Sequence, residues 1–330
     1  MKRLSLVELK NIKIQDLFWD RYIGLVKKVI IPYQWDILND RVEDVEPSHC
    51  LENFKIAAGK KEGEFYGAVF QDTDAAKWLE AVAFTLATNP DEELEKMADQ
   101  VIELIGEAQQ PDGYINTYFT IKEPDQRWKN LEEGHELYTA GHLMEAAAAY
   151  YKATGKRRFL DYICRFADLI CQVFSEENNK DGYPGHQEVE IGLIKLYEVT
   201  GQARYLNMAA EFLERRGWEP NYFLEEEKQP DFKRITPELN HYLPLYSQSH
   251  KPVKEQETAE GHAVRAVYMY CAMADVAARK DDRQMLVTCE KLWDDITQKK
   301  MYITGSIGSS GLLERFTTAY DLPNSSNYSE

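Results

Sequence analysis

Residues 305–330 form a stretch in which side chains capable of proton transfer stand among residues that disfavour helices. Glu314 is followed by Arg315 and Phe316, and Glu330 comes after a run rich in Ser and Asn. Gly, Ser, Thr and Asn predict irregular backbone here, whereas the aromatic residues and the turn at Asp321 favour an ordered loop over disorder. A carboxyl group held in such a loop can donate or accept a proton. The alternative interpretation of Glu314 is an ordinary exposed loop charge.

Four of the seven histidines lie near the start of an apolar helical segment, and each follows a glycine: His135, His142, His186 and His262. If the helices form a ring, their starts face one end of it, which would bring His135 or His142 together with His186 and His262. Neutral imidazoles there could bind sugar hydroxyls, assist proton transfer or ligate a metal. We favour hydroxyl recognition, because zinc binding by three histidines demands a tight geometry. The alternative is that Gly-His merely marks helix starts in a repeat.

Gln71, Asp72 and Asp74 precede another apolar helix, at the corresponding point of an earlier repeat. We expect them to lie on the same rim as the histidines; the alternative is that Thr73 or Asp74 caps the helix. A polar and aromatic pocket with acidic residues favours a carbohydrate-active enzyme. Glycoside cleavage uses one carboxyl group as proton donor and a second group across the bond as nucleophile or base. Glu314 is the best candidate for the proton donor.

The elements that must position these residues are paired helices that recur roughly every fifty residues, a period that signals repeats. Apolar periodicity predicts helices over 77–87, 94–105, 138–153, 158–174, 188–199, 204–216, 263–278 and 283–298. The first helix of each pair is apolar nearly all round, and the second is amphipathic. Buried inner helices with half-exposed outer helices predict an all-α fold, an α/α toroid of the (α/α)6 barrel type that is incomplete in this chain.

Other segments do not follow the pattern of repeating helix pairs. Alternating apolar residues over 4–15 predict short N-terminal β-strands, and a helix follows from 18 to 31, with Pro32 as its stop. We therefore expect short strands in residues 1–15 and a helical domain in residues 16–330. Two long returns, 43–73 and 219–260, mix aromatic and charged residues, which suggests a ligand wall; a linker is the alternative.

Composition and net charge limit the classes of molecule that the chain is expected to bind. The chain has 330 residues, 44% of them hydrophobic, and a formal charge of -17. Such a negative field disfavours nucleic acid and anionic membranes, and no apolar run is long enough to span a bilayer. Five cysteines without CxxC spacing predict reduced thiols in a cytoplasmic protein.

Seven ordered motifs carry a specific resemblance: ENFKIAAGKKEGEFYG, VFQDTDAAKWLEA, QQPDGYINTYF, GHELYTAGHLMEAA, DGYPGHQEVEIGL, EGHAVRAVYMY and LERFTTAYDLPNSSNYSE. Together they resemble glycoside hydrolase family 127, whose characterised members are β-L-arabinofuranosidases with an (α/α)6 barrel and flanking β-sandwich domains. The resemblance implies that Glu314 is the general acid/base of a retaining mechanism and that Glu330 binds zinc. It also implies that His135, His186 and His262 line the sugar pocket. The strands of residues 1–15 would then belong to a β-sandwich, and residues 16–330 would be an α/α-barrel catalytic domain, truncated before its end.

In the resembling family three cysteines complete the zinc site, and one of them is proposed as the nucleophile. None of the five cysteines here matches them, so we expect a truncated family member with little turnover by itself. Leu313 stands where relatives often have glycine. The resemblance implies partners that contain arabinofuranose, and a homodimer is possible. Two alternatives stay open: a related glycosidase of different sugar specificity, and a non-catalytic carbohydrate-binding toroid.

Overall fold

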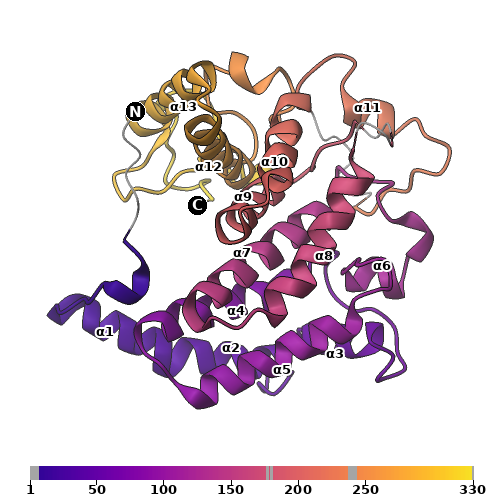
Figure 1. Cartoon of the computed structure of the whole chain (residues 1–330). Coiled ribbons are helices and arrows are strands. Elements are labelled where there is room, and N and C mark those ends of the chain that lie inside the picture. The colour runs from indigo at the N-terminus through magenta and orange to yellow at the C-terminus, as the bar shows by residue number, and fades with distance from the viewer. Residues whose placement is uncertain (1–6, 176–177, 179–180, 237–243, 329–330) are drawn as a thin grey trace. The chain divides into compact units, whose positions relative to one another are not determined.

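The computed structural model describes residues 7–175, 178, 181–236 and 244–328, and within these the regular secondary structure is helical. Figure 1 shows these helices coloured along the chain. The chain divides into two compact units. Unit 1 comprises Met1–Asp125 and His142–Leu169, and unit 2 comprises Gln126–Gly141 and Ile170–Glu330. Of the three boundaries, one falls in the 3-10 turn Pro124–Gln126, and the other two fall inside helices α7 (Glu136–Thr154) and α8 (Arg158–Val173). We describe each unit by itself.

Unit 1 contains six further helices: α1 (Leu17–Leu25), α2 (Ile31–Leu38), α3 (Cys50–Ala57), α4 (Asp72–Thr88), α5 (Glu92–Ala108) and α6 (Thr117–Ile121). Helix α5 shows why these segments fold as they do. Asp91 accepts a hydrogen bond from the backbone N–H of Leu94 at 3.2 Å, which caps the helix. Apolar side chains at helical spacing, among them Val101 and Ile105, are then buried on one face.

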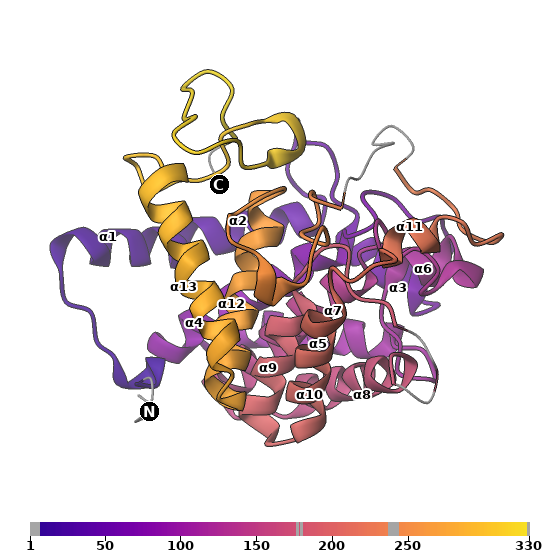
Figure 2. The ribbon, with the colours of Figure 1, turned by 90° about the horizontal axis from the view of Figure 1, so that it is seen from above.

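Unit 2 is built on α9 (Val189–Thr200), α10 (Ala203–Arg215), α12 (Ala263–Lys280) and α13 (Arg283–Asp295), with the short α11 (Tyr222–Glu226) in the return between α10 and α12. Figure 2 shows α9, α10, α12 and α13 side by side, and α9 and α12 each contact α10. Gly201 ends α9 with a φ of 72°, which suits a glycine. The starts of α9 and α12 carry the histidines discussed below.

The helix pairs predicted from periodicity are confirmed as helices, with ends that differ by a few residues. The first members of the pairs are the more deeply buried: most of α9 is inaccessible to solvent, including Ile194 and Leu196. None of the helices in the described ranges is both long and apolar enough to cross a membrane. Closure of the helices into a toroid stays a prediction.

Three expectations were wrong. The predicted N-terminal strands are absent from residues 7–15, where the only regular element is a 3-10 turn, Leu9–Asn11; residues 4–6 lie outside the described residues. That segment is exposed and has no partner strand, without which alternation cannot produce a sheet. Pro32 does not stop a helix, because a π-helical turn, Val26–Ile30, precedes it and helical backbone continues through Ile31 into α2. The return 43–73 contains α3, which was not predicted.

Candidate active site

Glu314 lies on a short closed loop that is fastened to the start of α12. Ser310 and Arg315 exchange backbone hydrogen bonds of 3.2 and 3.1 Å, and the N–H of Phe316 donates to the carbonyl of Gly261 at 2.9 Å. Leu313 and Glu314 adopt φ angles of 60° and 49°. Two successive non-glycine residues in the left-handed region are strained. The backbone pairs on either side hold this turn and direct the Glu314 side chain.

The closest partner of Glu314 is His262. Atom Nε2 of His262 lies 2.9 Å from Oε2 of Glu314. His262 is also the N-cap of α12, since its Nδ1 accepts from the backbone N–H of Arg265 at 3.4 Å. Burial, and then the charge of Arg265, lower the pKa of His262 to about 3. The imidazole is therefore neutral near pH 7. Because Nδ1 accepts a hydrogen bond, Nε2 carries the ring proton and donates a hydrogen bond to the carboxyl group of Glu314.

His186 and His135 continue this row of imidazoles. The ring centroids of His186 and His262 are 5.5 Å apart, and those of His135 and His186 are 5.8 Å apart. The Nδ1 atoms of His186 and His135 lie 2.8 and 2.5 Å from the carbonyls of Gln187 and Glu133, so Nδ1 donates in each ring. Burial lowers the pKa of His186 well below its usual value. A neutral His186 thus presents Nε2 as an acceptor for a hydroxyl proton.

Two buried arginines fix the turn that carries His186. Arg265 donates to the carbonyl of Gly185 at 2.5 Å, and Arg216 donates to the carbonyl of Pro184 at 2.6 Å. Gly185 is required here, because a Cβ atom would lie 2.1 Å from the carbonyl oxygen of Glu132. Arg265 therefore contacts two histidine segments at once, His262 through its backbone and the His186 turn through its side chain.

The predicted rim residues of the earlier repeat all lie at the start of α4, in unit 1. Both carboxylate oxygens of Asp72 accept from Thr117, at 2.7 Å from its N–H and 2.5 Å from its hydroxyl. Asp72 is 2% exposed, and burial raises its pKa to about 6. Gln71 donates to Asp74 at 2.8 Å. Asp72 thus ties α4 to α6, and the substrate role expected for Gln71, Asp72 and Asp74 stays a prediction.

The family model described as "Beta-L-arabinofuranosidase, GH127 catalytic domain" matches residues 11–330. The chain belongs to glycoside hydrolase family 127. A non-reducing end β-L-arabinofuranosidase of Bifidobacterium longum subsp. longum is 38% identical over 97% of this chain and 51% of that protein.

Two solved family 127 structures have the same fold. Ara127N-Se, a GH127 β-L-arabinofuranosidase from Geobacillus stearothermophilus T6, is 55% identical with a TM-score of 0.93, over 97% of this chain and 50% of that one. The GH127 β-arabinofuranosidase BT3674 is 38% identical with a TM-score of 0.84, over 98% of this chain and 48% of that one. The chain therefore spans about half the length of the family 127 proteins that it matches.

Two of the described cysteines do not suit the zinc site that family 127 membership implies. Glu330, the expected ligand of that site, lies outside the described residues. Cys50 is fully buried and donates to the carbonyl of Gln71 at 3.3 Å, and burial raises the pKa of the Cys289 thiol to about 11. Zinc is bound by thiolates, whereas these two groups are held as thiols. We derive no catalytic step through zinc.

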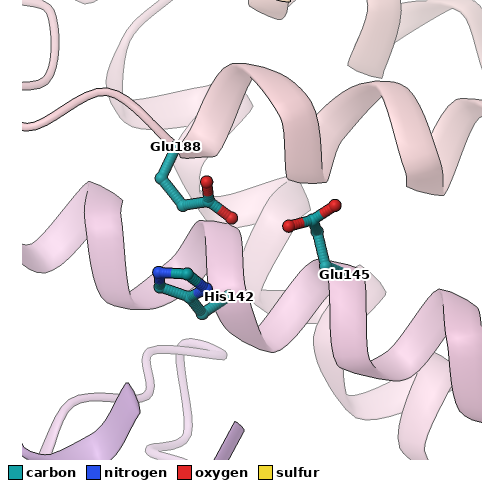
Figure 3. Close-up of side chains that lie close together, drawn as sticks. All are labelled: His142, Glu145 and Glu188. Carbon is teal, nitrogen blue, oxygen red and sulfur yellow. The ribbon is translucent and has the colours of Figure 1, made fainter. Parts of the chain in front are cut away.

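A different imidazole and carboxylate pair could hold a metal ion of unassigned identity. His142 and Glu145 stand three residues apart on α7, and Figure 3 shows both side chains on that helix. Burial lowers the pKa of His142 to about 3, which keeps the ring neutral as a ligand must be. Glu188, the third side chain in Figure 3, precedes α9 and is 1% exposed. Sequence reasoning treated His142 only as an alternative to His135.

Sequence reasoning also missed Arg265 and Tyr138. Tyr138 packs on His186 with ring centroids 4.3 Å apart, and Arg265 binds the His186 turn as described above. The available signal was position: Tyr138 comes three residues after His135, and Arg265 comes three residues after His262, so each lies in the first turn of a helix that a histidine precedes.

Proposed function

We propose that this chain provides the proton donor and the sugar-binding histidines of a β-L-arabinofuranosidase. The observation that carries the proposal is the 2.9 Å contact between His262 and Glu314 at the end of a row of three imidazoles. A carboxyl group that transfers protons beside several hydroxyl-binding groups is the arrangement that glycoside hydrolysis needs.

In this proposal Glu314 protonates the glycosidic oxygen as the bond to the leaving group breaks and later removes a proton from the attacking water. His262 donates to one oxygen of Glu314 and so keeps that carboxyl group in one orientation. His186 accepts a hydrogen bond from a sugar hydroxyl through Nε2, and His135 does the same from the neighbouring position. The strained turn at Leu313 supports the orientation of Glu314.

A retaining mechanism also needs a nucleophile across the sugar from Glu314. The family 127 resemblance gives this role to a zinc-bound cysteine, for which Cys50 and Cys289 are not suited. We propose no residue of this chain for it. For unit 1 by itself, we propose that Gln71 and Asp74 bind sugar hydroxyls and that the buried Asp72 holds the start of α4 in place through Thr117.

The substrate class follows from the relatives. Two of the proteins compared above are named β-L-arabinofuranosidases, and one acts at the non-reducing end. We propose that terminal β-L-arabinofuranosyl residues of oligosaccharides or glycoconjugates are the substrates. A related glycosidase acting on another sugar, and a sugar-binding module without turnover, are the competing functions.

The test is hydrolysis of methyl β-L-arabinofuranoside and of an arabinofuranosyl disaccharide by the protein and by its Glu314→Gln variant. We expect Glu314→Gln to lower kcat by about 10²- to 10⁴-fold, the usual contribution of a general acid/base. The matched control is Glu257→Gln, at an exposed glutamate of unit 2, which should retain activity. Sugar binding without hydrolysis in both proteins would favour the binding module. Hydrolysis of other pentosides alone would favour a different specificity.

A further inference from the structure

Two glutamine side chains inside unit 2 join the segment that carries His186 to the segment that carries His262. Gln187 follows His186 in the chain, and Gln248 lies in the return between α10 and α12; both are 0% exposed. Atom Nε2 of Gln187 donates to Oε1 of Gln248 at 2.9 Å. Because both side chains are inaccessible to solvent, neither can contact a ligand, and direct sugar binding does not account for them.

The amide of Gln248 also binds the backbone at the start of α12. Its Nε2 donates to the carbonyls of Tyr246, Glu260 and His262, at 3.0, 2.8 and 3.1 Å. A nitrogen that faces three carbonyl oxygens is the donor end of the amide, so Oε1 has to face Gln187. The direction of this amide is therefore fixed by its surroundings.

The backbone that carries Gln248 is itself held in place. Arg216 donates to the carbonyl of Ser247 at 2.7 Å and to that of Pro184 at 2.6 Å, so one buried cation contacts both this return and the turn of His186. Gln248 has a φ of 55°, a conformation that a residue other than glycine keeps only where its surroundings require it. The amide thus lies between two fixed pieces of backbone.

We infer that Gln248 is a positioning residue of the candidate active site, and that its amide sets the separation between the rings of His186 and His262. The inference rests on the proposed function, in which His186 binds a sugar hydroxyl and His262 orients Glu314. The 5.5 Å between the two ring centroids then determines how far the bound sugar lies from the proton donor. An amide carries no charge near neutral pH, so it holds this separation without titrating.

The direct test is the separation of the two rings in crystal structures of the protein and of its Gln248→Met variant. Methionine has a similar length but neither donates to the carbonyls nor accepts from Gln187. We expect the distance between the ring centroids of His186 and His262 to change by more than about 0.5 Å, the tolerance of a pre-organised site. An unchanged separation in Gln248→Met would overturn the inference.

Hydrolysis of methyl β-L-arabinofuranoside well below Tm gives a second readout, which a merely structural role would not move. We expect Gln248→Met to lower kcat/KM by about 10²-fold, the cost of misplacing a group by about 1 Å. Gln187→Met keeps the donor to the three carbonyls and should lower kcat/KM by about three- to tenfold, the range for one neutral hydrogen bond. In a His186→Ala background, Gln248→Met should cost much less than it does alone. Losses that simply multiply would contradict a role through His186.

Thr288→Val is the matched control for loss of a buried hydrogen bond. Thr288 is 3% exposed, and its hydroxyl donates from α13 to the carbonyl of Lys254 in the same return at 2.9 Å. This variant should lower Tm but leave both the ring separation and kcat/KM unchanged. If the unmodified protein hydrolyses no pentoside, the proposed function fails, whereas the ring separations still decide whether Gln248 holds the two histidines.

Discussion

Nε2 of His262 lies 2.9 Å from Oε2 of Glu314, while Nδ1 of the same ring caps α12. One imidazole therefore joins a helix start to the loop that carries the proposed proton donor. The cap fixes which nitrogen bears the proton, so the orientation of Glu314 depends on how α12 begins.

His262→Asn separates these two roles. Asparagine is a good N-cap, so α12 should keep its stability, but the shorter amide cannot reach Glu314. We expect kcat to fall by about ten- to a hundredfold with little change in Tm, because a hydrogen bond to a charged group is lost. His262→Ala should lose the same activity and in addition about 1 kcal/mol of stability with the cap. Steady-state kinetics and thermal melts measure both effects. Full activity in His262→Asn would contradict the assigned contact.

Arg265 should affect the site in two ways, by its hydrogen bond to the Gly185 carbonyl and by its positive charge, and two substitutions distinguish these effects. Arg265→Met removes the charge that helps to lower the pKa of His262 and of His186. Both pKa values should then rise towards 6.5, and the acid limb of the pH–rate profile should move to higher pH. Arg265→Lys keeps the charge, so the limb should stay in place while the lost Gly185 contact lowers kcat/KM about tenfold. Arg283→Met, at an exposed position in the first turn of α13, is the control and should change neither quantity.

Leu313→Gly should stabilise the protein. The residue has a φ of 60°, which costs a non-glycine residue about 1 kcal/mol or more, so relief of this strain should raise the free energy of unfolding by about 0.5–1 kcal/mol. The neighbouring Leu312→Gly, at an exposed position without a positive φ, should instead lower it. Denaturant unfolding of the two variants gives the comparison. A fall in stability in Leu313→Gly would show that the turn is not strained.

Glu132 should make stability decrease as the pH rises. Burial raises its pKa to about 8, against the opposing charge of Arg234, which Glu132 shares with Glu133 and Glu227. A carboxyl group whose pKa is raised by folding stabilises fully below about pH 4.5, and the stabilisation is lost as the pH rises through 8. Relative to wild type, Glu132→Gln should therefore gain stability between pH 5 and 8, by about 1–2 kcal/mol after screening. Glu257→Gln, at an exposed glutamate, should show no such trend in urea unfolding.

The sequence predicted the helix pairs well because apolar periodicity is a local property, as the match between the predicted helix 158–174 and α8 shows. It failed where local signals conflict with their surroundings. The short α3 begins at Cys50, and its N-cap residue, His49, has a φ of 52° and makes no side-chain cap hydrogen bond, so no start signal was available. Pro32 indicated a stop, but the preceding π-helical turn allows the helix to continue.

The histidines were found from their position at helix starts and Glu314 from the Gly- and Ser-rich loop around it, and the structure brings Glu314, His262, His186 and His135 together within unit 2. The sequence did not indicate that two arginine side chains are buried beside this site. An arginine on a helix is usually exposed, yet Arg265 is 3% exposed and Arg216 is fully buried. The left-handed turn at Leu313 was also not visible, because leucine gives no sign of a positive φ.

The hydrogen bond from Phe316 N–H to the Gly261 carbonyl gives the Glu314 loop a built-in probe. That amide proton exchanges with solvent only when the loop leaves the start of α12. Its exchange rate thus reports, in the unmodified protein and without any label, how much of the time the carboxyl group is positioned for proton transfer. A sugar that binds against His262 should slow this exchange, whereas a ligand bound elsewhere should not.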